Sequence, residues 1–239
     1  MAERVGKPQA LYPKRFWQVV PGVRFFSFYT FAVVVIRFLL KTIVRFELRG
    51  IENVPVAGPI MIVSNHINIA DPPIIGGTLG RKVLFMAKEE LFTVPVMGWI
   101  VANFDAFPVK RGAADRQALR NAELAASLGI AVGMFPEGTR SRDGVMKRAF
   151  PGAAMVALRA NCPIVPVGID GSEHLFSSLR RGRRATVKVT YGQPFRLETP
   201  SEGAGRLDRL TDTMMRRVAD LLPEWRRGPY QSDPLSVAE

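Results

Sequence analysis

A histidine and an aspartate stand five residues apart in the stretch SNHINIADPP, which covers residues 64 to 73. His66 is one of only two histidines in the chain. An imidazole can accept a proton near neutral pH, and a carboxylate across a tight turn can orient the ring and stabilise its protonated form. Such a pair supplies a general base without a nucleophilic serine. The spacing alone is weak evidence, because Asp71 followed by Pro72 is also typical of a helix N-cap.

The flanking segments place this pair at the end of a strand. IMIVS, residues 60 to 64, is a continuous apolar run that predicts a buried strand. Residues 72 to 79 predict a helix with prolines in its first turn. His66 is therefore expected in the loop between strand and helix, where the reactive groups of α/β proteins usually lie.

Predicted strands and helices alternate along most of the chain. Predicted strands cover residues 60–64, 82–87, 106–109, 130–135, 163–169 and 185–191, and predicted helices cover 72–79, 91–102, 115–128, 151–160 and 204–222. This order predicts an α/β fold in which helices flank a central mixed, largely parallel sheet. No linker marks a second globular domain. The tail from Gly228 onward is expected to pack weakly.

The N-terminal part is apolar and basic. FFSFYTFAVVVIRFLLKTIVRF, residues 25 to 46, has an uncharged run that ends at Ile36 and is too short to span the ~30 Å hydrocarbon core. Arg37, Lys41 and Arg45 then recur every four residues, on one face of a predicted helix. We expect a membrane-associating helix that lies in the bilayer interface. The alternative is a core helix with three snorkelling cations.

Composition narrows the class of protein. The formal net charge of +12 in 239 residues indicates an anionic partner. Nucleic acid is not expected, because there is no aromatic RNA-binding motif, zinc-finger spacing or long basic helix. The single cysteine, Cys162, suits a reducing compartment and is interpreted as core filler. We expect no signal peptide, no nucleophile elbow of a lipase and no metal site.

Three later stretches strengthen the interpretation of the His66 motif. FPVKRG (107–112), FPEGTRS (135–141) and VPVGI (165–169) follow NHINIAD in that order. Together they resemble the lysophosphatidic acid acyltransferase family, glycerolipid acyltransferases with an NHxxxxD motif. The resemblance covers residues 45 to 195. It implies transfer of a fatty acyl group from acyl-CoA or acyl carrier protein to the hydroxyl of a lipid acceptor, with no cofactor.

The resemblance also implies roles for matching residues. His66 is the expected general base and Asp71 its support. Arg111 and Arg140 are expected to bind the acceptor phosphate through paired guanidinium donors. Gly138 and Thr139 are expected to form a tight turn beside the substrate. Glu137 is expected to pair with an arginine or to contact the acceptor.

One position departs from the family pattern, because Lys110 stands where an acidic residue is frequent. That departure leaves the acceptor open: lysophosphatidic acid is favoured, and glycerol 3-phosphate, another lysophospholipid or a glycolipid are alternatives. A membrane lipid carrier without catalysis is the alternative outside the enzyme class. Arg180, Arg181, Arg183 and Arg184 form a basic loop that is suited to lipid headgroups or coenzyme A phosphates, or is simply solvated.

The expected organisation follows from these points. Residues 1–45 form an N-terminal membrane-associating segment, residues 46–227 an acyltransferase domain and residues 228–239 a C-terminal tail. The expected partners are the acyl thioester, lysophosphatidic acid and anionic membrane lipids. The expected location is the cytoplasmic face of the cell membrane, peripheral or monotopic.

Overall fold

The structure is a computed structural model that describes residues 38, 42–79, 81–94, 98, 106–109, 115–198 and 205–231. The elements are β1 (Val44–Arg49), η2 (Ile51–Asn53), β2 (Met61–Ser64), α2 (Asp71–Thr78), β3 (Val83–Lys88), η3 (Glu89–Phe92), β4 (Phe107–Val109), α4 (Arg116–Ser127), β5 (Ala131–Met134), α5 (Gly152–Arg159), β6 (Ile164–Asp170), η4 (Ser172–His174), α6 (Leu175–Arg180), β7 (Ala185–Tyr191), α7 (Arg206–Ala219), η5 (Glu224–Arg226) and η6 (Gly228–Tyr230).

A seven-stranded sheet runs through the centre in the order β1-β7-β6-β2-β5-β3-β4. All neighbouring strands are parallel except β6 and β7, which pair antiparallel. The predicted mixed, largely parallel sheet is therefore confirmed. Parallel strands need a crossover connection, usually a helix that packs on one face of the sheet, which explains why strands and helices alternate along the chain.

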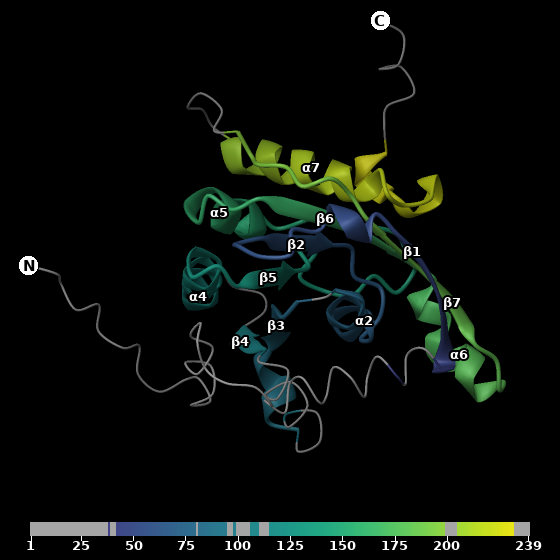
Figure 1. Ribbon diagram of the computed structural model, residues 1–239. Coiled ribbons are helices and arrows are strands. Elements are labelled where there is room, and N and C mark those ends of the chain that lie inside the picture. Colours follow the sequence, from purple (N-terminus) through teal and green to yellow (C-terminus); the bar gives the residue numbers. More distant parts are fainter. Residues whose placement is uncertain are drawn as a thin grey trace, which may run out of the picture.

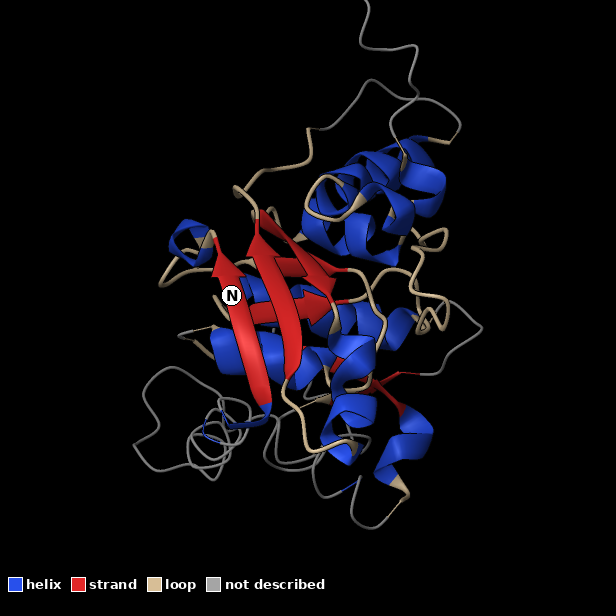
Figure 2. Cartoon of the chain, turned by 90° about the vertical axis from the view of Figure 1, so that its right-hand side faces the viewer, coloured by secondary structure: helices blue, strands red, loops and turns tan. Residues whose placement is uncertain are grey.

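Helices cover both faces of this sheet (Figures 1 and 2). One hydrophobic cluster joins the strands to α4, α5 and α7, and a second joins them to α2 and α6. β2 shows the division clearly, because Met61 belongs to the first cluster and Ile62 to the second. Successive side chains of a strand point to opposite faces, so a strand covered on both sides reads as one continuous apolar run.

The first strand corrects one sequence expectation. β1 begins at Val44, so Arg45 lies in a strand and not on the helical face predicted for residues 25–46. Val44, Phe46 and Leu48 alternate with charged residues, as expected of a half-exposed edge strand. Strand β1 therefore crosses the predicted domain boundary between residues 45 and 46. Within the membrane-associating segment predicted over residues 1–45, the structure describes only residues 38 and 42–45, so Arg37 and Lys41 lie outside the described residues.

The described part of the C-terminal tail also differs from expectation. Tyr230 in η6 is buried, and its hydroxyl oxygen accepts a hydrogen bond from the Ala149 backbone N–H at 2.8 Å. The prediction of weak packing is therefore wrong for Gly228–Tyr230. Most of the helix predicted over residues 91–102 lies outside the described residues. Among the described residues, no helix combines the length and the apolar character needed to cross a bilayer.

Candidate active site

The candidate site lies at one edge of the sheet, where three parallel strands end. His66 follows β2 by two residues, Glu137 follows β5 by three and Ser172 follows β6 by two. These strands are neighbours in the sheet, so their carboxyl ends meet at the same edge. The topology thereby brings together residues that are up to about a hundred positions apart in the chain.

His66 and Asp71 face each other, as predicted. The imidazole Nδ1 lies 2.8 Å from Asp71 Oδ2, and both side chains are buried. With Nδ1–H donating this hydrogen bond to the carboxylate, Nε2 carries the lone pair of the neutral imidazole. The imidazole stacks on Phe135, with ring centroids 4.2 Å apart. One apolar wall and one carboxylate thus fix the orientation of the ring.

Asp71 is itself held by the backbone and by a serine. Oδ2 also accepts hydrogen bonds from the Ile67 N–H at 2.8 Å and the Asn68 N–H at 2.7 Å. Oδ1 accepts a hydrogen bond from the Ser172 hydroxyl at 2.6 Å. These three donors and the imidazole fix the orientation of the carboxylate. Asp71 is thus fully buried and held in one orientation toward the imidazole.

The N-cap expectation for Asp71 is wrong. Helix α2 has Ala70 at its N-cap, and Asp71 is the first helical residue, with prolines behind it. Its carboxylate turns back to the N–H groups of the preceding loop, whereas a cap would accept from the next two or three residues. The expected proline in the first turn is confirmed.

Asn65 joins the two central strand ends. Its side-chain Nδ2 donates to the Ile169 carbonyl at 2.9 Å, and its Oδ1 accepts from the Ile169 N–H at 2.9 Å. A carboxamide that meets both backbone groups of one residue continues the hydrogen-bond ladder beyond Ser64, where β2 ends. Asn65 therefore attaches the loop that contains His66 to strand β6.

Glu137 is buried directly under this loop. Its Oε1 accepts a hydrogen bond from the His66 N–H at 3.0 Å, and its Oε2 accepts one from the Lys147 N–H at 2.9 Å. Burial raises the pKa of Glu137 to about 7, although both backbone hydrogen bonds act in the opposite direction. Among the described contacts, Glu137 holds two loops together and does not pair with an arginine. The predicted role in substrate binding stays a prediction.

The residues after Glu137 form the expected tight turn. The Gly138 N–H donates to the Phe135 carbonyl at 3.0 Å, and Gly138 has a φ of 66°, which a side chain would strain. Thr139 and Arg140 are exposed. The next N–H, that of Ser141, donates to the His66 carbonyl at 2.7 Å. Arg140 therefore directly precedes a residue whose backbone is hydrogen-bonded to the backbone of His66.

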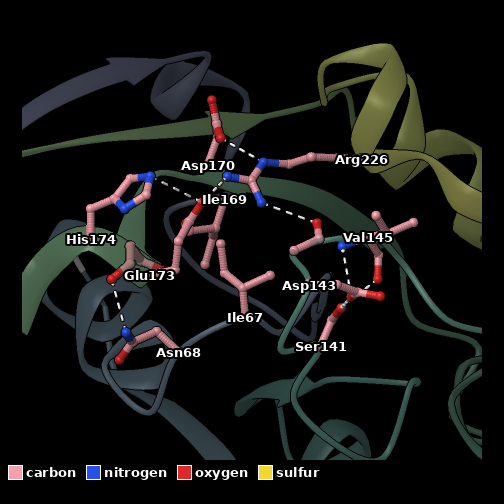
Figure 3. A network of polar contacts seen from close by, with 12 residues as sticks. Ile67, Asn68, Ser141, Asp143, Val145, Ile169, Asp170, Glu173, His174 and Arg226 are labelled. Carbon is pink, nitrogen blue, oxygen red and sulfur yellow. Dashed lines mark hydrogen bonds and ion pairs between the residues drawn. The ribbon is translucent and has the colours of Figure 1, made fainter.

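A buried arginine from the C-terminal part of the chain braces both loops (Figure 3). Arg226 Nε donates to Asp170 Oδ1 at 2.6 Å, and its terminal nitrogens donate to the Gly144 carbonyl and to Glu173. Gly144 follows the loop of Glu137, and Glu173 is the neighbour of Ser172. Arg226 therefore connects the segment after α7 to the two loops that contact His66 and Asp71.

Two other predicted residues have different outcomes. Arg111 lies outside the described residues. Cys162 is buried in the hydrophobic core, and burial raises the pKa of its thiol, so it is unsuited to be a nucleophile. The described residues contain no cluster of three or more side chains suited to hold a metal ion.

The acyltransferase family model matches residues 45–170, which is more than half of the chain. The chain belongs to this family. The family match runs from the second residue of β1 to the end of β6 and includes His66, Asp71 and Glu137 but not Ser172. The resemblance inferred from the NHINIAD and FPEGTR stretches is thereby confirmed.

Individual relatives agree with the family. The chain is 28% identical to a Brassica napus chloroplastic 1-acyl-sn-glycerol-3-phosphate acyltransferase over 73% of its own length and 50% of that protein, so it spans about half of that relative. It is 28% identical to the Bacillus subtilis 1-acyl-sn-glycerol-3-phosphate acyltransferase over 71% of its own length and 84% of that protein. It is also 30% identical to the Pseudomonas aeruginosa lyso-ornithine lipid O-acyltransferase, over 68% and 67% of the two chains.

A solved structure supports the same fold within the family. The crystal structure of the 1-acyl-sn-glycerophosphate acyltransferase PlsC from Thermotoga maritima aligns with a TM-score of 0.62 and 26% identity. The alignment covers 81% of this chain and 80% of that one. The similarity therefore extends over the family domain and beyond it.

Sequence reasoning missed the residues that support the pair from a distance. Ser172, Asn65 and Arg226 are all buried polar residues with side-chain hydrogen bonds to remote parts of the chain. Asn65 has a local signal, because it precedes His66 in the motif. Ser172 and Arg226 have none, since nothing near them in the sequence reveals the partners that the fold supplies.

Proposed function

We propose that this chain is a membrane-associated 1-acyl-sn-glycerol-3-phosphate O-acyltransferase, which moves a fatty acyl group from an acyl thioester to the free hydroxyl of lysophosphatidic acid to give phosphatidic acid. The observation that carries the proposal is the buried contact of His66 Nδ1 with Asp71 Oδ2 at 2.8 Å. Family membership and the names of the Brassica and Bacillus relatives support the substrate class.

His66 acts as the general base in this proposal. Its Nε2 takes the proton of the acceptor hydroxyl while the hydroxyl oxygen attacks the thioester carbonyl. The tetrahedral intermediate collapses, the carbon–sulfur bond breaks, and the proton on Nε2 passes to the departing thiolate. Asp71 stabilises the imidazolium throughout. Because a thioester is already activated, no acyl-enzyme and no cofactor are needed.

Arg140 and Arg111 are proposed to bind the acceptor phosphate. Arg140 is exposed, and the Ser141 contact keeps its backbone beside His66. A guanidinium there can hold a phosphate with paired donors and place the acceptor hydroxyl near Nε2. Gly138 and Thr139 form the turn that precedes this arginine, and Glu137 fixes the turn through its hydrogen bonds to the His66 and Lys147 N–H groups.

A second candidate acceptor has specific support. The Pseudomonas aeruginosa relative at 30% identity is named for a lyso-ornithine lipid and not for a glycerol phosphate. Lys110, which departs from the common family pattern, also leaves the headgroup preference open. The reaction and the role of His66 are the same for both acceptors, so the choice depends on the headgroup contacts.

A panel of acceptors tests the proposal. Purified protein would receive radiolabelled acyl-CoA or acyl-ACP together with lysophosphatidic acid, glycerol 3-phosphate, other lysophospholipids, a glycolipid or a lyso-ornithine lipid. We expect fastest labelling of lysophosphatidic acid, with one of the two thioesters preferred. Faster labelling of the lyso-ornithine lipid would favour the second candidate. Label transfer to none of them would support a lipid carrier without catalysis.

The proposed location is the cytoplasmic face of the cell membrane, through residues 1–43 and anionic lipids. A truncation that tests this must spare β1, because Val44 is a buried strand residue. Deletion of residues 1–41 is expected to weaken sedimentation with vesicles and to raise the substrate concentration needed for half-maximal rate. Unchanged sedimentation would contradict the proposed anchor.

A further inference from the structure

The short helix α6 has an outer surface that the proposed reaction does not use. Leu175 packs in the core, whereas Phe176 is 50% exposed and Leu179 is 48% exposed. Residues three and four apart lie on one helical face, so Phe176, Leu179 and Arg180 project together. Arg181 and Arg183 follow in the exposed turn. These five residues are called the α6 surface below.

The arginines of the α6 surface lack acidic partners among the described residues. The acidic side chains of the flanking elements are engaged elsewhere, because Glu173 pairs with Arg226 and Glu47 lies 3.9 Å from Lys188. No ion pair with a described residue involves Arg180, Arg181 or Arg183. Exposed apolar side chains beside cations without acidic partners are typical of a surface that enters an anionic lipid interface.

Helix α6 lies near the candidate active site. The helix starts directly after η4, whose Ser172 donates to Asp71. The chain then enters β7, which runs antiparallel to β6, so β7 begins at the edge of the sheet where β2, β5 and β6 end. The α6 surface is therefore at the edge that carries His66 and Asp71.

The N-terminal segment joins the domain at the same place. β1 and β7 are parallel, with Val44 opposite Ala185, and the Arg184 guanidinium donates to the Val44 carbonyl at 2.7 Å. Figure 1 shows α6 beside the first residues of β1. The apolar and basic residues that precede Val44 in the sequence thus connect to the domain next to the α6 surface.

We propose that the α6 surface docks on an anionic lipid bilayer as a second contact beside the N-terminal segment. Phe176 and Leu179 enter the interface, and Arg180, Arg181 and Arg183 bind lipid phosphates. Two contacts at one edge of the sheet orient that edge toward the membrane, so that the His66–Asp71 pair faces the surface from which a lipid acceptor arrives. This orientation rests on the proposed function, but the lipid contact itself does not require it.

The first test compares binding of the full-length protein to two kinds of vesicle. Vesicles of phosphatidylcholine alone are compared with vesicles that contain phosphatidylcholine and phosphatidylglycerol in equal parts. The variant that changes Arg180, Arg181 and Arg183 to Gln is expected to lose about tenfold or more of its partitioning to the anionic vesicles, since one basic residue near an acidic surface accounts for about fivefold. The matched control changes Arg120, Arg159 and Arg209, exposed arginines on α4, α5 and α7, and is expected to bind like the wild type.

The second test works even if the N-terminal segment dominates binding. Cys162 is the only cysteine and is buried, so Leu179→Cys introduces a single accessible thiol for an environment-sensitive fluorophore. Leu128→Cys is the control, because Leu128 is equally exposed but follows α4 at the opposite edge of the sheet. The label at position 179 is expected to shift to the blue on anionic vesicles, and the label at position 128 is not. Absence of a shift at position 179 on vesicles that sediment the protein would overturn the proposal.

Acyl transfer in detergent micelles separates this proposal from the proposed function. The Arg180, Arg181 and Arg183 variant is expected to keep the wild-type rate in neutral micelles, because none of these residues contacts the His66–Asp71 pair. Loss of vesicle binding with full micellar activity supports the α6 contact. Inactivity of the wild type toward every acceptor would remove the proposed function while the fluorophore shift would still decide the lipid contact.

Discussion

The hydroxyl of Ser172 donates a 2.6 Å hydrogen bond to Asp71 Oδ1 across 101 positions of the chain. Both side chains are completely buried. The bond fixes the rotation of the carboxylate whose other oxygen contacts His66. It therefore joins the end of β6 to the start of α2, and Ser172 becomes a candidate positioning residue for the His66–Asp71 pair, which is proposed to be catalytic.

Replacement of Ser172 by Ala is expected to lower kcat about tenfold with little change in KM. A hydrogen bond to a charged group contributes about 1.5–3 kcal/mol, and its loss frees the carboxylate to turn away from His66. Steady-state acyl transfer with the wild type and the variant measures this split. Ser177→Ala is the control, because Ser177 donates only to the nearby His174 carbonyl. A variant with unchanged kcat would show that the bond is merely structural.

Glu137 is expected to make the stability of the protein depend on pH. Burial raises its pKa from 4.5 to about 7, so the folded state binds this proton more tightly than the unfolded state. The stabilisation is complete below the unfolded value and is lost as the pH rises through about 7. Urea unfolding should give a wild-type free energy that falls by on the order of 2 kcal/mol between about pH 5 and about pH 8.

Glu137→Gln supplies the comparison for that pH dependence. The variant is expected to be less stable than the wild type at about pH 5, because a carboxamide accepts only one of the two backbone N–H bonds. Its free energy of unfolding is expected to change less than that of the wild type over the same pH range. Equal slopes for the two proteins would show that Glu137 titrates normally in the fold.

Loss of Arg226 is expected to destabilise the protein strongly. Arg226→Met leaves Asp170, Glu173 and the Gly144 carbonyl without their donor, and the removal of one member of a buried ion pair costs about 3 kcal/mol. Arg209→Met on the exposed side of α7 is the control and should change the free energy of unfolding little. A small effect of Arg226→Met in urea unfolding would contradict the bracing role.

Arg140→Ala is expected to distinguish acceptors with and without phosphate. If its guanidinium binds the acceptor phosphate, kcat/KM falls about ten- to a hundredfold for lysophosphatidic acid. A phosphate-free acceptor that wild type uses should be affected little. Arg159→Ala, remote from the site on α5, controls for the loss of an exposed charge. Equal losses for both acceptors would contradict phosphate binding.

The parts of the site that sequence could predict are the local ones. His66 and Asp71 share one turn after an obvious apolar strand, and the later stretches that resemble the acyltransferase family distinguished this pair from a chance spacing. Gly138 likewise revealed its turn through residue type. Ser172 and Arg226 could not be found in this way, because each acquires its partner only when parallel strands align their ends.

The parts of the fold that sequence misjudged also have physical causes. β1 continues from an apolar and basic stretch, so its first residues resembled the end of a helix, although Val44, Phe46 and Leu48 alternate with charges as a strand requires. The C-terminal segment is polar and contains proline, which suggested loose packing. Tyr230 packs there because its hydroxyl oxygen accepts a hydrogen bond from the Ala149 N–H, a partner that only the fold supplies.

His66 is proposed to be the general base for acyl transfer. The direct measurement is the single-turnover rate of radiolabelled acyl transfer to the best acceptor by His66→Ala, with circular dichroism and urea unfolding to confirm an intact fold. A positioned general base contributes about 10²–10⁴-fold, so the rate is expected to fall by a factor of that size. A folded His66→Ala protein that transfers the acyl group within about tenfold of the wild-type rate would contradict it.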